Sequence, residues 1–97
     1  MHEPDFEEGG VAIRRGWWRQ VTRAGRVRIQ GARLTLMNSY GAQIDSDALH
    51  RVRVTRPWFA PKGLVRLAMA GNTYWLRLGP ERAHATVEAA TTRQLRA

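Results

Sequence analysis

Arginine is the residue type in this sequence that is most able to bind a ligand. The 97 residues include fifteen arginines and one lysine, Lys62. Seven arginines alternate with apolar residues, as outward positions of β-strands do. These are Arg26, Arg28, Arg33, Arg51, Arg53, Arg66 and Arg77. If neighbouring strands align them, they form a basic face suited to a phosphate backbone. Trp75 also falls on an outward-facing strand position. Aromatic rings among arginines are typical of stacking sites for single-stranded nucleic acid. The alternative is that the arginine stems cover apolar sheet surface and that Trp75 fills a dimer contact.

A second candidate site is the loop of residues 57–63, in which two prolines flank Trp58 and Phe59, and Lys62 follows. A stiff loop with large aromatic side chains loses little entropy on docking, so it suits a partner-binding anchor. The alternative interpretation has Trp58 and Phe59 folding inward to close one end of a barrel.

Catalysis has little support in the sequence. His50 lies near Asp45, Ser46 and Asp47 in the sequence. Because all four residues belong to one short segment, the histidine cannot lie between a serine nucleophile and an aspartate that orients it, as a catalytic triad requires. We expect the two aspartates and Ser46 to bond their local backbone as turn residues. There is no cysteine, metal-ligand spacing or phosphate-binding glycine motif. The sequence therefore predicts no enzyme, no metal and no cofactor.

Charge is distributed unevenly along the chain. The formal net charge is +8, yet residues 1–10 contain four acidic residues and no lysine or arginine, so residues 11–97 carry +12. A body this basic attracts phosphates, anionic membrane surfaces or acidic proteins, although a GC-rich coding bias also produces arginine. We expect residues 1–10 to be a flexible acidic tail, closed by Gly9-Gly10, whose carboxylates occupy the basic surface part of the time.

Composition limits the class of protein. With 43% apolar and 25% charged residues, residues 11–97 suit one globular domain. No apolar run approaches the roughly 20 residues that span a bilayer, and the N-terminus is acidic where a signal peptide is basic. These features predict a cytoplasmic protein.

Short segments rich in β-formers alternate with turn signals, a pattern typical of antiparallel sheets with one wet face. Strands are predicted at about 15–23, 26–30, 33–38, 43–49, 50–56, 64–70 and 73–78. Turns are predicted at Ala24-Gly25, Gly31-Ala32, 38–41 and Gly71-Asn72.

Alternation also predicts the core. The inward set is Val27, Ile29, Leu34, Leu36, Val52, Val54, Val65, Leu67, Met69, Tyr74, Leu76 and Leu78. Gly79-Pro80-Glu81 is typical of a helix start. The helix that follows carries a narrow apolar stripe of Ala83, Val87, Ala90 and Leu95.

Seven short strands followed by one C-terminal helix resemble the pleckstrin-homology-like fold, over about residues 11–97. The stretch from Ile44 to Val52 has an apolar residue, a polar linker and a leucine before the next strand. It is similar to a segment found midway in small bacterial members of the family. The resemblance implies an antiparallel, partly open barrel or sandwich capped by the helix. A five-stranded OB-like or Sm-like barrel is the competing architecture.

The resemblance also implies a possible anionic ligand. Lipid-binding members of the family carry a basic signature that Arg19, Arg26 and Arg28 loosely match, with Arg23 nearby. Three guanidinium groups converging on one hairpin would hold a phosphate. The loop between the two predicted strands is shorter here than an inositol-phosphate pocket needs.

These observations predict a non-enzymatic adaptor that docks a protein partner. Its docking surfaces are the 57–63 loop, the basic sheet face and the sheet edge beside the helix, where family relatives can accept an extended peptide. The alternatives are a nucleic-acid-binding protein that uses the arginine face and a binder of anionic lipid.

Overall fold

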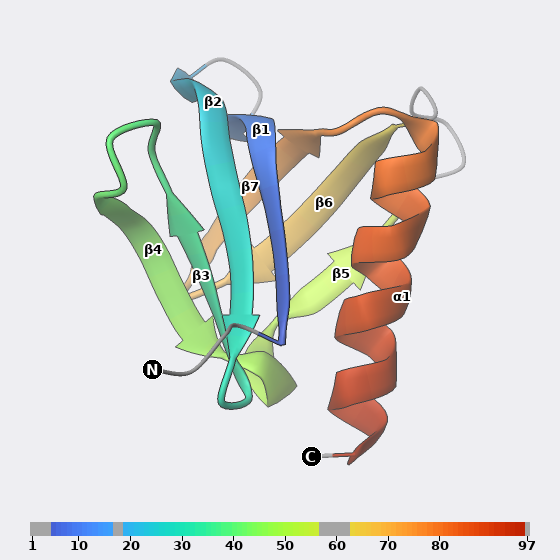
Figure 1. Cartoon of the computed structure of the whole chain (residues 1–97). Helices are drawn as coiled ribbons and strands as arrows, with labels where there is room; N and C mark the ends of the chain where they lie inside the picture. The colour runs from blue at the N-terminus through green and yellow to red at the C-terminus, as the bar shows by residue number, and fades with distance from the viewer. Residues whose placement is uncertain (1–4, 17–18, 57–62, 97) are drawn as a thin grey trace.

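The chain folds as seven antiparallel strands and one C-terminal helix (Figure 1). The structure is a computed structural model that describes residues 5–16, 19–56 and 63–96. Its strands are β1 (Phe6–Arg15), β2 (Arg19–Gln30), β3 (Arg33–Met37), β4 (Gln43–Ala48), β5 (Arg53–Thr55), β6 (Leu64–Met69) and β7 (Asn72–Arg77). They form one sheet in the order β4-β3-β2-β1-β7-β6-β5, which does not close on itself. The predicted fold class is confirmed.

The core lies on the inner side of this curled sheet, as alternation predicts. Every predicted core residue is buried except Val54, which is half-buried and packs against the others. Val11 and Ile13 of β1 join them, together with Leu49 from the short 3₁₀ helix η1 (Leu49–Arg51) that separates β4 from β5. Because η1 occupies these positions, β4 and β5 are both shorter than the predicted strands 43–49 and 50–56.

The helix α1 (Pro80–Arg96) begins where the sequence predicts and packs on β5, β6 and η1. Ala83 and Ala90 are fully buried, and Val87 packs against the core. Thr86 is also fully buried, and its hydroxyl donates to the Arg82 carbonyl at 2.8 Å, which satisfies the polar group inside the helix. No helix in the described part of the chain is long and apolar enough to cross a membrane.

The sheet begins earlier in the chain than predicted. Strand β1 starts at Phe6, so the prediction that residues 6–10 belong to a flexible tail is wrong; residues 1–4 lie outside the described residues. Gly9-Gly10, taken as the end of a tail, is a bulge in β1: the pairing register with β2 shifts between Gly9 and Val11. Gly10 adopts a φ of +64°, which glycine tolerates without strain.

The predicted turn at Ala24-Gly25 is also wrong, because β2 runs through it without a break. The predicted strand 15–23 is therefore divided between β1, which ends at Arg15, and β2, which begins at Arg19, and the predicted strand 26–30 is the second part of β2. Gly25 is buried within β2, where the pairing register with β1 shifts. A Cβ atom at this position would lie 2.6 Å from the Met37 carbonyl oxygen. The glycine allows a close approach of two strands rather than a turn.

The remaining turns agree with the sequence. Gly31-Ala32 connects β2 to β3, and both residues have a φ of +59°, as the central residues of a two-residue hairpin require. The 38–41 turn is present. The β6–β7 hairpin turns at Ala70-Gly71, one residue before the predicted pair.

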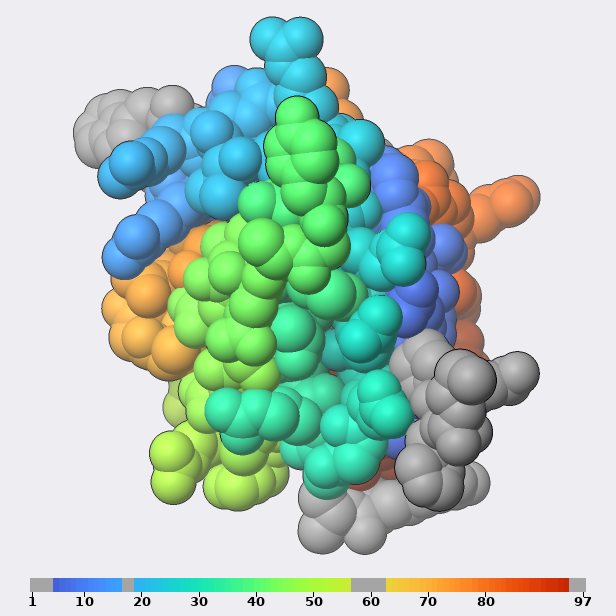
Figure 2. Space-filling view, turned by 60° about the vertical axis from the view of Figure 1, so that its left-hand side comes forward, coloured from blue at the N-terminus to red at the C-terminus, as the bar shows by residue number. Residues whose placement is uncertain are grey.

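Two aspartates join the β4 edge to the β6–β7 hairpin, across the open side of the sheet. The Tyr74 hydroxyl donates to Asp45 at 2.6 Å, and the Ala70 N–H donates to Asp47 at 2.9 Å. Figure 2 shows the β6–β7 hairpin, in orange, lying against β4, in green. Burial and the bond to Asp45 raise the pKa of Tyr74 to about 12, while the Ala70 N–H lowers the pKa of Asp47.

The same carboxylates also bond their own strand. Asp45 accepts the Ser46 N–H at 2.9 Å, and Asp47 accepts the Ala48 N–H at 2.8 Å. These local bonds were predicted, but for a turn rather than a strand. Because the two N–H groups on this edge strand are already satisfied, they are not available to an added strand.

Gly25→Ala is expected to lower the free energy of unfolding by about 1–3 kcal/mol or more, the cost of overpacking a filled site. The new methyl group meets backbone at Met37 and the Thr22 side chain, each 2.6 Å away. Urea titration followed by circular dichroism measures the change. Gly9→Ala is the matched control, because its nearest neighbour is the Arg26 side chain at 3.8 Å. Equal stability of the two variants would show that the Met37 backbone does not approach Gly25 this closely.

Tyr74→Phe is expected to lower the free energy of unfolding by about 1–3 kcal/mol at pH 7, because Asp45 loses a charge-assisted hydrogen bond. Tyr40→Phe, which changes a 94% exposed side chain, is the control and should be neutral.

The same bond predicts a dependence on alkaline pH. The Tyr74 hydroxyl ionises near pH 10 in the unfolded chain and near pH 12 in the folded one. Its contribution is therefore complete below pH 10 and lost as the pH rises toward 12. Tyr74→Phe should lose less stability over this interval than the parent. Parallel curves for the two proteins would rule out the Tyr74–Asp45 bond.

Candidate binding face

The sheet order divides the predicted basic face into two groups of arginines. Arg26 and Arg28 lie on β2 and Arg33 lies on the adjacent β3, whereas Arg53, Arg66 and Arg77 lie on β5, β6 and β7, with β1 between the two groups. Arg51 lies apart from both, in η1. The continuous basic face that the sequence suggests is therefore interrupted by β1.

The acidic half of β1 neutralises the two arginines of β2, while Arg33 of β3 donates to the Ser46 hydroxyl. Glu7 contacts Arg26 at 3.0 Å and Arg28 at 2.9 Å, and the neighbouring Glu8 contacts Arg82 of α1 at 3.3 Å. The predicted contact between N-terminal carboxylates and basic side chains is thus present, although a paired strand makes it rather than a flexible tail.

The second group lies on a surface that we call the Trp75 face. It comprises the outward side chains of β5, β6, β7 and the second half of β1: Arg53, Thr55, Leu64, Arg66, Trp75, Arg77, Ala12 and Arg14. Strand pairing fixes the arrangement, since Trp75 is directly opposite Arg66 on one side and Arg14 on the other. Arg77 is opposite Leu64 and Ala12 in the next row.

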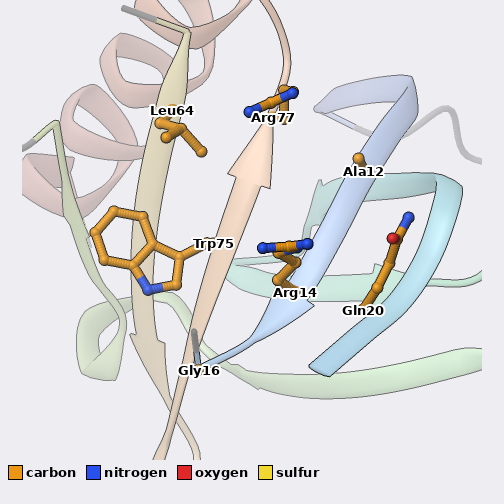
Figure 3. A pocket seen from close by; sticks show the side chains of 7 residues that line it. All are labelled: Ala12, Arg14, Gly16, Gln20, Leu64, Trp75 and Arg77. Atoms are coloured by element: carbon orange, nitrogen blue, oxygen red, sulfur yellow. The ribbon is translucent and has the colours of Figure 1, made fainter. Parts of the chain in front are cut away.

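Trp75 points outward as predicted, but the prediction that it is exposed is wrong, because only 6% of its surface is accessible. Directly opposed cross-strand side chains lie about 5 Å apart at Cβ, so the long chains of Arg14 and Arg66 flank the indole. Beside it is a cavity of about 250 Å³, lined by Ala12, Arg14, Gly16, Gln20, Leu64, Trp75 and Arg77 (Figure 3). In this view the indole and Leu64 lie over β6, while the two arginines stand on β1 and β7.

The charges on this face are not internally balanced. Arg53, Arg66 and Arg77 are exposed, and no carboxylate within residues 5–16, 19–56 and 63–96 forms an ion pair with any of the three. The described carboxylates are instead engaged elsewhere or lie off this face: Glu7 and Glu8 bind other arginines, and Asp45 and Asp47 bind the β6–β7 hairpin.

Sequence reasoning missed Arg14, because the predicted first strand began one residue later. The signal was present: Val11 and Ile13 are apolar and alternate with Ala12 and Arg14. The four acidic and glycine residues before Val11 concealed it, since such a composition is common in loops.

The predicted phosphate signature is not assembled in the structure. Arg26 and Arg28 bind Glu7, while Arg19 lies at the other end of β2, paired with Arg15 of β1. The residues predicted to anchor a partner through the 57–63 loop, Trp58, Phe59 and Lys62, lie outside the described residues, as do Trp17 and Trp18.

Residues considered for catalysis are not brought together. His50 is exposed in η1, and the two neighbouring aspartates bond the β6–β7 hairpin and their own strand. Over the described ranges, no group of three histidine or acidic side chains is placed to hold a metal ion.

No protein-family model matches this chain, and a search of curated proteins found no match.

Glu7→Gln is expected to increase the affinity of the protein for a polyanion, because it releases Arg26 and Arg28 from their carboxylate. The salt concentration that elutes the protein from a heparin column measures this. Glu88→Gln is the matched control: it also removes one negative charge, but from a helix position whose ion-pair partner is His84. Elution of both variants at the same salt concentration would show that Glu7 does not mask the two arginines.

Proposed function

We propose that this protein is a non-enzymatic docking module that binds an acidic segment of a partner protein on the Trp75 face. The observation that carries the proposal is the set of three exposed arginines, Arg53, Arg66 and Arg77, which no described carboxylate neutralises. Like charges on neighbouring strands repel one another. A partner that supplies carboxylates relieves this repulsion and gains charge-assisted hydrogen bonds.

The apolar part of the face supports a protein partner. The half-buried Leu64 and Ala12 line the cavity beside Arg14 and Arg77, and protein interfaces combine apolar and arginine side chains in this way. A partner side chain that enters the cavity would bury apolar surface while its neighbours meet the guanidinium groups.

The same observations favour a protein over nucleic acid. A stacking site presents the open face of an aromatic ring, and Trp75 is 6% exposed. Of the arginines predicted to form the nucleic-acid face, Arg26 and Arg28 already bind Glu7. Binding of anionic lipid through Arg19, Arg26 and Arg28 lacks the convergence that such a site needs.

We further propose that the domain is a pleckstrin-homology-like module. The seven antiparallel strands, the open sheet and the single C-terminal helix support this relationship. Such a module presents two further docking candidates, the 57–63 loop and the β5 edge beside α1.

The proposal predicts that a fluorescein-labelled glutamate-rich peptide binds the full-length protein and that Arg66→Gln weakens this binding by at least about threefold, the scale of one exposed ion pair. Fluorescence anisotropy at low ionic strength measures the dissociation constant. Arg33→Gln is the matched control, because Arg33 carries the same charge on β3 and donates to Ser46.

Two outcomes would contradict the proposal. One is equal weakening by the two substitutions, which would mean that only net charge matters. The other is tighter binding of a single-stranded oligonucleotide of equal charge, which would favour nucleic acid as the partner.

A further inference from the structure

Three arginines of the Trp75 face form a diagonal across adjacent strands. Arg53 of β5 is opposite Ala68, which lies two residues from Arg66 on β6. Arg66 is in turn opposite Trp75, which lies two residues from Arg77 on β7. Each step along the line Arg53–Arg66–Arg77 therefore crosses one strand and advances two residues in the same direction.

Sheet dimensions give the spacing of these charges. Neighbouring strands lie about 4.8 Å apart and two residues span about 6.8 Å, so successive Cα atoms on the diagonal are about 8 Å apart. The whole line is thus about 16 Å long. It crosses the sheet obliquely, and one end lies beside Leu64 and the Trp75 cavity.

An extended peptide offers a matching set of charges. Its alternate side chains point to one side and repeat about every 6.8 Å, and long arginine side chains cover the remaining difference of about 1.5 Å per step. Consecutive acidic residues point to opposite sides, so only every second one faces the arginines. A helix binds through an apolar stripe in an apolar groove, whereas this diagonal is lined with guanidinium groups.

We infer that the diagonal Arg53–Arg66–Arg77 recognises acidic side chains at alternate positions of an extended partner segment. The inference rests on the proposed function and makes it more specific, because it states the spacing and conformation of the ligand. Arg66, at the middle of the diagonal, is the residue on which recognition of the spacing depends most.

The test uses three labelled peptides of identical composition, each with three glutamates among serine, threonine and glycine. In one the glutamates alternate with neutral residues, in the second they are consecutive, and in the third they are four residues apart. Fluorescence anisotropy with the full-length protein at low ionic strength gives the three affinities. The alternating peptide is expected to bind at least about threefold more tightly than either of the others. Arg66→Gln should remove this preference, whereas Arg33→Gln should preserve it.

The outcomes separate the inference from the proposed function. Equal binding of the three peptides, all weakened by Arg66→Gln but not by Arg33→Gln, would overturn the spacing rule and leave the acidic docking face intact. Tighter binding of the peptide with the four-residue spacing would also overturn it, in favour of a helical ligand. Binding of none of the peptides would overturn both the inference and the proposed function.

Discussion

The curvature of the open sheet depends on the contact between its β4 edge and the β6–β7 hairpin. In the described part of this seven-stranded sheet no ladder of hydrogen bonds joins the two edge strands, β4 and β5, so the ladders alone do not fix its curvature. Here the carboxylates of Asp45 and Asp47 on the β4 edge reach the β6–β7 hairpin and accept hydrogen bonds from Tyr74 and Ala70. The absence of a side chain at Gly25 of β2 lets the Met37 backbone of β3 approach closely on the same side of the sheet. The core is enclosed as a result, and α1 packs against β5 and β6 beside it.

The order of the strands gives the basic side chains two different environments, one with neighbouring carboxylates and one without. The outer surface of β2 carries Arg26 and Arg28, and the acidic half of β1 lies beside it and satisfies both. The second half of β1 pairs with β7 as well as with β2 and brings no carboxylate to the surface that it shares with β7. One strand thus neutralises one arginine group and completes the Trp75 face with Arg14.

Residue periodicity was sufficient to predict most of the core and the class of fold. Alternation placed Val27, Ile29 and the other inward residues correctly because one face of each strand is buried. It failed where local composition and tertiary contact disagree. Gly25 has the composition of a turn, but the structure uses it to admit the Met37 backbone close to β2. Gly9-Gly10 has the composition of a flexible tail, but it belongs to a strand that pairs with β2. The candidate site was only partly predictable for the same reason: parity gives the outward direction of Trp75, but its burial depends on which side chains the neighbouring strands place opposite it.

The most direct test of the acidic docking face is to observe the arginine side chains themselves. Two-dimensional ¹⁵N–¹H spectra of labelled protein resolve the Nε–Hε groups, and titration with the peptide of alternating glutamates reports which of them bind. We expect saturable shifts for Arg53, Arg66 and Arg77 and little change for Arg26 and Arg28, which Glu7 already engages. Shifts spread evenly over all the exposed arginines, or concentrated on Arg26 and Arg28, would contradict it.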